Sequence, residues 1–98
     1  MRLTYHPEAE AELIDSAQFY ENRTAALGAQ FLDAVDRAIR IIQDAPTRGQ
    51  VLKGDVRSHM LKRFPFSIYY RTQMGELRIL AIMHHSRRPA YWKNRLTD

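Results

Sequence analysis

The stretch FPFSIYYRTQMGELRILAIM, residues 64–83, decides the fold of this chain. In its first half, Phe66, Ile68 and Tyr70 alternate with a serine, a tyrosine and an arginine. A period of two is typical of a β-strand, because successive side chains point to opposite faces of the sheet. In its second half, residues 77–83 are apolar on both faces at the middle, which predicts a central strand.

Turn-forming residues separate these two strands from each other and from a third one. Residues 73–76, with the sequence QMGE, predict the turn between them. Phe64-Pro65 predicts another turn, after an earlier strand over residues 56–62. Residues 46–55 contain glycines and are predicted to form a loop. Three strands joined by short turns predict an antiparallel meander.

The part of the chain before this meander predicts a strand followed by two helices. Apolar and polar residues alternate over residues 3–5, which is typical of a short strand. Apolar residues at helical spacing then predict a helix that starts at Pro7 and ends at a break over residues 22–28. Residues 27–44 predict a second amphipathic helix, which Pro46 stops. Two helices with a short connection form a hairpin that can lie on a sheet.

These elements predict one α+β domain over residues 1–98. Its order is an N-terminal strand, an α-helical hairpin, a three-stranded antiparallel meander and a short C-terminal tail or helix. The terminal helix is expected over residues 90–95, with Pro89 near its start. The helical hairpin is expected to cover one face of the sheet, which leaves the other face and the tail for function.

The charge of the chain is distributed unevenly. The formal net charge is +4. Residues 1–45 contain four basic and eight acidic residues, whereas residues 46–98 contain eleven basic and three acidic residues. Such asymmetry in a small domain favours a surface that faces a polyanion or an acidic partner protein.

Several classes of protein are disfavoured by the sequence. No apolar run is long enough to span a membrane, and the N-terminus is predicted to be a strand and not a signal peptide. The chain contains no cysteine, so it has no disulfide framework, and a reducing, cytoplasmic location is expected. No cofactor is expected, because there is no phosphate loop or dinucleotide fingerprint. No metal site is expected, because adjacent His84 and His85 point to opposite faces of a strand.

Residues 84–95, HHSRRPAYWKNR, gather cations, imidazoles and aromatic rings at the end of the predicted central strand. Arginine can hold a phosphate in a bidentate fork, and Tyr91 and Trp92 could stack on unpaired bases. His84 or His85 could transfer a proton near neutral pH. The alternative is structural: Trp92 covers the edge of the core while the arginines lie in solvent.

Other cations are spread over the predicted loop and strands, and they could neutralise phosphates or the acidic groups of a partner. They are Lys53, Arg57, Lys62, Arg63, Arg71 and Arg78. The acids of the first helix are expected to form a solvated face without a paired-carboxylate site. They are Glu8, Glu10, Glu12 and Asp15.

Nearly the whole chain resembles toxins of the RelE/ParE superfamily. Residues 5–13 (YHPEAEAEL), Phe19-Tyr20 and residues 28–31 resemble the opening of these toxins. Residues 57–71, with the Phe-Pro turn, and residues 84–92 are similar to their middle and final parts. The resemblance implies the α+β fold predicted above. It also implies a toxin of a type II toxin–antitoxin system, whose cognate antitoxin wraps the toxin with a flexible, often acidic segment.

The resemblance implies two different targets. RelE-like toxins enter the ribosomal A site and cleave mRNA. In an enzyme of that kind Arg87 or Arg88 would stabilise the reacting phosphate, and Tyr91 or His85 would transfer protons. ParE-like toxins instead inhibit DNA gyrase. Ser67 stands where the ribonucleases have an arginine on the third strand, and the long helical hairpin is more similar to ParE.

We therefore favour growth inhibition through DNA gyrase, with ribosome-dependent mRNA cleavage as the alternative. A third hypothesis is an inactive module that only binds the antitoxin. In each case one set of residues is expected to bind the target or the antitoxin. The set is Arg57, Lys62, Arg63, Arg71, Arg78, Trp92, Lys93 and Arg95.

Overall fold

The computed structural model describes residues 1–88 and 90–97. The elements of this part of the chain follow in the order β1 (Arg2–Tyr5), α1 (Pro7–Arg23), α2 (Leu27–Asp44), the 3₁₀ turn η1 (Pro46–Arg48), β2 (Gln50–Lys53), β3 (Val56–Met60), β4 (Phe66–Gln73), β5 (Glu76–His84) and the 3₁₀ helix η2 (Lys93–Thr97). None of the helices in the described part is both long and apolar enough to cross a membrane.

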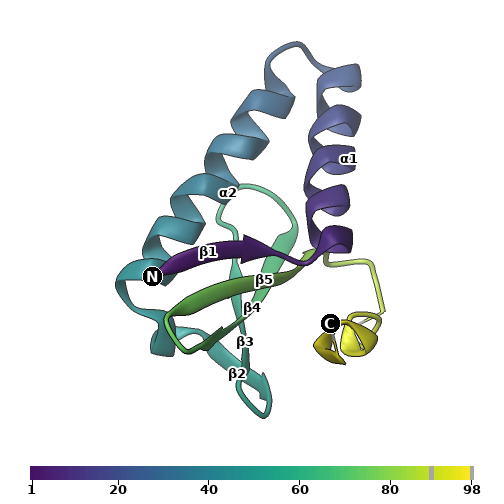
Figure 1. The fold of residues 1–98 in the computed structure, drawn as a ribbon. Coiled ribbons are helices and arrows are strands. Elements are labelled where there is room, and N and C mark those ends of the chain that lie inside the picture. Colours follow the sequence, from purple (N-terminus) through teal and green to yellow (C-terminus); the bar gives the residue numbers. More distant parts are fainter. Residues whose placement is uncertain (89, 98) are drawn as a thin grey trace.

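The strands form one five-stranded sheet in the order β1-β5-β4-β3-β2. Strands β2 to β5 are antiparallel neighbours, and β1 pairs in parallel with β5. Strand β5 therefore lies inside the sheet between β1 and β4, as the apolar run at residues 77–83 predicted. The helical hairpin stands over this sheet, and the C-terminal segment returns beside the N-terminal end of α1 (Figure 1).

The main core lies between the helical hairpin and one face of the sheet. Phe31 of α2 is fully buried there, and its ring is 5.2 Å from that of Phe64 and 4.9 Å from that of Phe66. Tyr20 of α1 joins the same cluster of rings. Edge-to-face aromatic contacts of this kind add to the burial of apolar surface, so they fix the hairpin on the sheet.

The helix boundaries follow from local chemistry. Pro7 occupies the first turn of α1, where its missing N–H is not needed, and His6 Nδ1 accepts a hydrogen bond from the backbone N–H of Glu8 at 3.1 Å. At the start of α2, the carboxylate of Glu21 accepts the backbone N–H groups of Ala26 and Gly28, at 2.9 and 3.0 Å. The first helix thus supplies the cap of the second.

The opposite face of the sheet is partly covered, so the expectation that it stays open is wrong in this region. The tail folds back and buries Trp92, whose ring meets that of Tyr69 edge-to-face at 5.4 Å. A register shift between β4 and β5 accompanies this packing, and the consecutive residues Leu80 and Ala81 both lie in the tail-side cluster. One extra residue in one strand produces such a shift and changes the face of the sheet to which the side chains point.

Two local predictions are also corrected. Residues 50–53 form strand β2 inside the predicted loop, so the meander has four strands. Every residue of β2 is exposed, so the strand has no buried face. Its sequence therefore shows no alternation of apolar and polar residues. The terminal helix is a 3₁₀ helix over Lys93–Thr97 and not a helix over residues 90–95. Pro89, expected near its start, lies outside the described residues.

Candidate functional site

The C-terminal segment is attached to the domain through a buried arginine. Arg95 is only 5% exposed, and its two terminal nitrogens donate to the two carboxylate oxygens of Glu12 on α1 at 3.0 and 2.9 Å. It also donates to the carbonyl of Leu80 on β5 at 2.9 Å. Burial alone would lower the pKa of Arg95, but hydrogen bonding to Glu12 and its charge raise it overall. This forked pair joins the tail, α1 and β5.

Glu12 corrects the expectation of a solvated acidic face on α1. Besides holding Arg95, one of its oxygens accepts the backbone N–H of Ile82 at 3.0 Å. Glu8, one turn earlier, lies 3.6 Å from Nε of Arg95. The spacing of four residues places Glu8 and Glu12 on the same helix face, which was visible in the sequence. The sequence did not show that this helix face meets a buried arginine.

Tyr91 is held between two arginines. The guanidinium carbon of Arg87 lies 4.0 Å from the centre of its ring, and that of Arg95 lies 4.8 Å from it. Burial raises the pKa of the Tyr91 phenol, and the nearby carboxylate of Glu12 raises it further. The Tyr91 side chain therefore packs as an aromatic ring, and its hydroxyl resists deprotonation near neutral pH.

Both histidines of the tail are engaged with serines. His85 Nε2 lies 2.9 Å from Oγ of Ser67, which is buried on β4. His84 Nδ1 accepts the backbone N–H of Ser86 at 3.0 Å and lies 2.8 Å from its hydroxyl. These contacts order the turn after β5. Within residues 1–88 and 90–97, no group of three potential metal-ligating side chains comes together.

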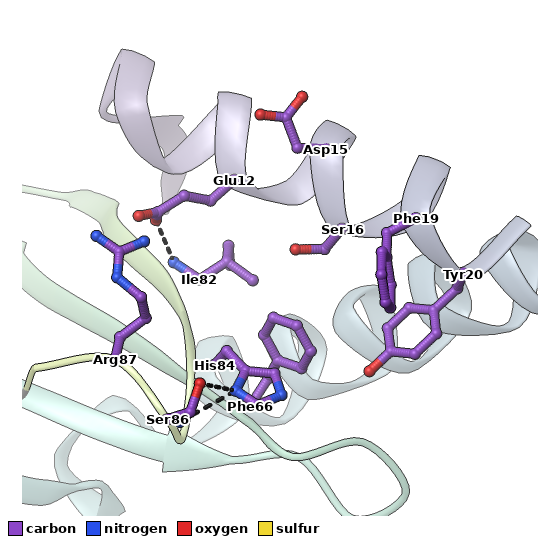
Figure 2. Close-up of a pocket in the computed structure, with 10 residues that line it drawn as sticks. All are labelled: Glu12, Asp15, Ser16, Phe19, Tyr20, Phe66, Ile82, His84, Ser86 and Arg87. Carbon is purple, nitrogen blue, oxygen red and sulfur yellow. Dashed lines mark hydrogen bonds between the residues drawn. The ribbon is translucent and has the colours of Figure 1, made fainter. Parts of the chain in front are cut away.

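A pocket of about 370 Å³ lies between α1 and the end of β5, and we call it the α1 pocket. Figure 2 shows His84, Ser86 and Arg87 on one side of it, with the side chains of α1 on the other. Phe66 and Ile82 supply apolar surface, and Phe19 at its border is 52% exposed. An apolar interior with charged groups at the rim suits the side chain of a protein partner.

A second groove, of about 350 Å³, lies between α2 and the segment after β3, and we call it the α2 groove. Two of the predicted cations, Lys62 and Arg63, line it together with His59 and exposed Met60. Burial lowers the pKa of His59, and the charge of Lys62 lowers it further. The groove therefore combines apolar surface with positive charge.

The remaining predicted cations lie in other places, so they do not form one platform. Arg57 donates to the carbonyls of Thr47 and Gly49, at 2.9 Å each, and fixes η1. Arg71 and Arg78 line a small polar pocket on the tail side of the sheet. Lys93 lines another pocket there with Lys53.

Apart from the exposed His85, the predicted residues fall into three groups. The exposed cations are Lys62, Arg63, Arg87, Arg88 and Lys93. The half-buried ones, with partners inside the chain, are Arg57, Arg71, Arg78 and Tyr91. Trp92 and Arg95 are buried, so they support the tail and do not present a surface.

A helical hairpin on a mainly antiparallel sheet, with a basic segment after the last strand, fits the α+β fold that the resemblance to RelE/ParE superfamily toxins implied. The family described as the ParE toxin of the type II toxin–antitoxin system parDE matches residues 3–89. The chain therefore belongs to the ParE toxin family of type II toxin–antitoxin systems.

Among solved structures, one titled "Chromosomal ParDE TA system from P. aeruginosa" is similar to this chain. The TM-score is 0.75, over 86% of this chain and 95% of that chain, at 23% sequence identity. At this identity the likeness shows a shared fold. No curated protein matches the sequence.

Proposed function

We propose that this chain is a toxin that inhibits growth by docking on DNA gyrase without cleaving a substrate, and that a cognate antitoxin neutralises it. Membership of the ParE family supports the toxin class. The state of Tyr91, one of the two residues to which the ribonuclease alternative assigns proton transfer, supports docking over catalysis. It is held between Arg87 and Arg95, and its pKa is raised.

Proton transfer is the step at which the two functions differ. An efficient general acid or base has a pKa near the working pH and reaches its substrate. Tyr91 has a raised pKa, and its hydroxyl is buried. Ser67 contributes no charge at the strand position where an arginine was expected in a ribonuclease, and it contacts His85 instead. The tail therefore offers exposed cations for docking, whereas Tyr91 is poorly suited to proton transfer and His85 is hydrogen-bonded to Ser67.

The exposed cations Arg87, Arg88 and Lys93 are the residues that we assign to the gyrase contact. All three are exposed, and two neighbouring residues of the same segment, Trp92 and Arg95, are buried against the domain. Positive charge arranged in this way accelerates the encounter with an acidic surface and favours one orientation.

We assign the antitoxin contact to the α2 groove. Lys62 and Arg63 stand at the border of a surface that includes Met60, which is 66% exposed, and Ile41, which is 47% exposed. An antitoxin segment with apolar residues on one side and acidic residues at its edges would match both features. The P. aeruginosa structure is likewise titled as a ParDE toxin–antitoxin system.

The decisive experiment compares a catalytic and a docking substitution. Tyr91→Phe removes only a hydroxyl, so we expect inhibition of gyrase supercoiling to stay within about twofold of the parent. Arg87→Glu with Arg88→Glu reverses the docking charges, so we expect at least a tenfold loss, on the order of 1.4 kcal/mol of binding. Arg40→Glu with Arg48→Glu is the control with the same charge change, since both are exposed and outside the tail.

Growth and RNA analysis distinguish the alternatives. Cleaved transcripts in expressing cells, together with loss of toxicity in Tyr91→Phe, would support the ribosome-dependent ribonuclease and exclude the gyrase proposal. The exposed imidazole of His85 and the guanidinium of Arg87 near the strand end are the features that favour this alternative. Normal growth without the antitoxin would identify an inactive antitoxin-binding module.

A further inference from the structure

Three arginines from distant parts of the sequence converge on one small pocket, which we call the arginine pocket. Arg71 of β4, Arg78 of β5 and Arg95 of the tail line a space of about 110 Å³ on the tail side of the sheet. Gln73 and Glu76 complete its polar lining. The space is several times the roughly 10–15 Å³ that a single water requires, so it can admit a small polyatomic ion.

The placement of Arg71 and Arg78 is unfavourable without a counter-ion. They are directly paired across β4 and β5, where like charges oppose sheet formation. Arg71 is compensated by a forked pair with Asp55, at 3.0 Å for the shortest contact. For Arg78, the hydrogen bond found in the described part of the chain is to the hydroxyl of Thr4, at 3.3 Å. The hydroxyl carries no charge, and the charge of Arg78 is compensated in part by Glu76, whose pKa Arg78 helps to lower.

Unused hydrogen-bond donors lie in the same region. Arg78 and Arg95 both line the pocket, and the Nε atom of each is buried without a hydrogen-bond partner in residues 1–88 and 90–97. Nε of Arg95 lies 3.6 Å from a carboxylate oxygen of Glu8, which is an ion pair beyond hydrogen-bonding distance. Buried polar groups normally have partners, so these two guanidinium groups beside the pocket are incompletely satisfied.

We propose that the arginine pocket is a binding site for a single phosphate group. Guanidinium groups bind phosphate oxygens through forked, charge-assisted hydrogen bonds, and three arginines line this pocket. Glu76 is the carboxylate of the lining, and it also contacts two residues of β1. It accepts the hydroxyl of Thr4 at 2.8 Å and lies 3.6 Å from Arg2. The bound phosphate would neutralise the arginine pair and join the β4–β5 hairpin to the tail.

The phosphate can be free inorganic phosphate or the terminal group of a phosphate monoester such as a mononucleotide. The pocket holds the phosphate alone, so the rest of a monoester would lie outside it. The site is separate from the exposed tail cations assigned to gyrase, and it is tested without any measurement of toxicity.

The test is a titration of the purified protein followed by NMR of the arginine Nε–H groups. Sodium phosphate and adenosine monophosphate are the probes, with adenosine and sodium chloride at matched ionic strength as blanks. We expect saturable shifts of the Nε–H signals of Arg78 and Arg95 with phosphate and none with the blanks. Equal binding of the monophosphate identifies a monoester site, whereas binding of phosphate alone identifies a site for the free ion.

Two substitutions of Arg78 make the result specific. Arg78→Gln removes the charge and the fork, so we expect the dissociation constant for phosphate to rise at least tenfold. Arg78→Lys keeps the charge and the fold but removes Nε, so we expect an intermediate loss. Arg48→Gln removes an exposed arginine outside the pocket and should bind phosphate as the parent does. Absence of saturation in the parent, or unchanged binding in a folded Arg78→Gln protein, would overturn the proposal.

Discussion

At the scale of single residues, Glu12 connects three parts of the chain through one carboxylate. It holds the guanidinium of Arg95, accepts the backbone N–H of Ile82 and helps to raise the pKa of the Tyr91 phenol. Removing one partner of a buried ion pair strongly destabilises the fold, because the other charge is left buried without compensation. The tail that presents Arg87 and Arg88 therefore depends on a residue that contacts no target.

We predict that Glu12→Ala destabilises the fold by about 3–5 kcal/mol, since the Arg95 guanidinium and the Ile82 N–H both lose their acceptor. Urea denaturation would measure this change in the free energy of unfolding. Glu10→Ala, at an exposed position of the same helix, should stay within about 0.5 kcal/mol of the parent. A loss of less than about 1 kcal/mol in Glu12→Ala would show that the pair contributes little.

At the scale of elements, the helical hairpin is held by a close approach that only a glycine permits. A Cβ atom placed on Gly28 would lie 2.5 Å from the backbone oxygen of Ala17. The contact joins the first turn of α2 to the body of α1, beside the cap that Glu21 provides. The distance between the helices, and hence their fit on the sheet, is set at this point.

We predict that Gly28→Ala destabilises the protein by about 1–3 kcal/mol, although alanine is the better helix former. The reason is that the backbone of α1 cannot move away as a flexible side chain could. Thermal unfolding followed by circular dichroism would measure the effect. Asp33→Ala, at an exposed position of the same helix, serves as the control. An unchanged or higher melting temperature in Gly28→Ala would contradict the packing argument.

At the scale of the whole molecule, burial acts on every tyrosine. The chain contains five tyrosines, and in each of them burial is the largest cause of a pKa raised above the ordinary 10.0. They belong to both cores: Tyr5 and Tyr20 pack on the helix side, and Tyr69 and Tyr91 on the tail side. Ionisation of these phenols therefore opposes the folded state as a whole.

We predict that stability falls as the pH rises above about 10, because the unfolded chain then releases phenolic protons that the folded chain retains. Below that pH the tyrosines are protonated in both states and have no effect on stability. Urea midpoints at about pH 8 and about pH 11 would show the loss, which should be smaller in Tyr91→Phe. Native phenols that ionise with a midpoint near the ordinary value would contradict it.

The sequence alone determined most of the elements and their order, except for β2 and the bounds of the terminal helix. The bounds of α2 follow from a regular apolar stripe that Pro46 ends, and β4 and β5 follow from a period of two and a QMGE turn. These signals are local, because a residue's spacing from its neighbours decides which face of its own element it occupies. The resemblance of nearly the whole chain added the toxin family and the class of partner.

Only the tertiary structure decided which charges remain available. Arg95 and Arg88 are both arginines of the same basic segment, yet one is buried on Glu12 and the other is exposed. Glu12 and Arg95 are 83 residues apart in the sequence, and Arg78 and Arg95 meet only because the tail returns over the sheet. The spacing of residues along the chain cannot predict such a contact, because the contact depends on how two distant segments pack against the same core.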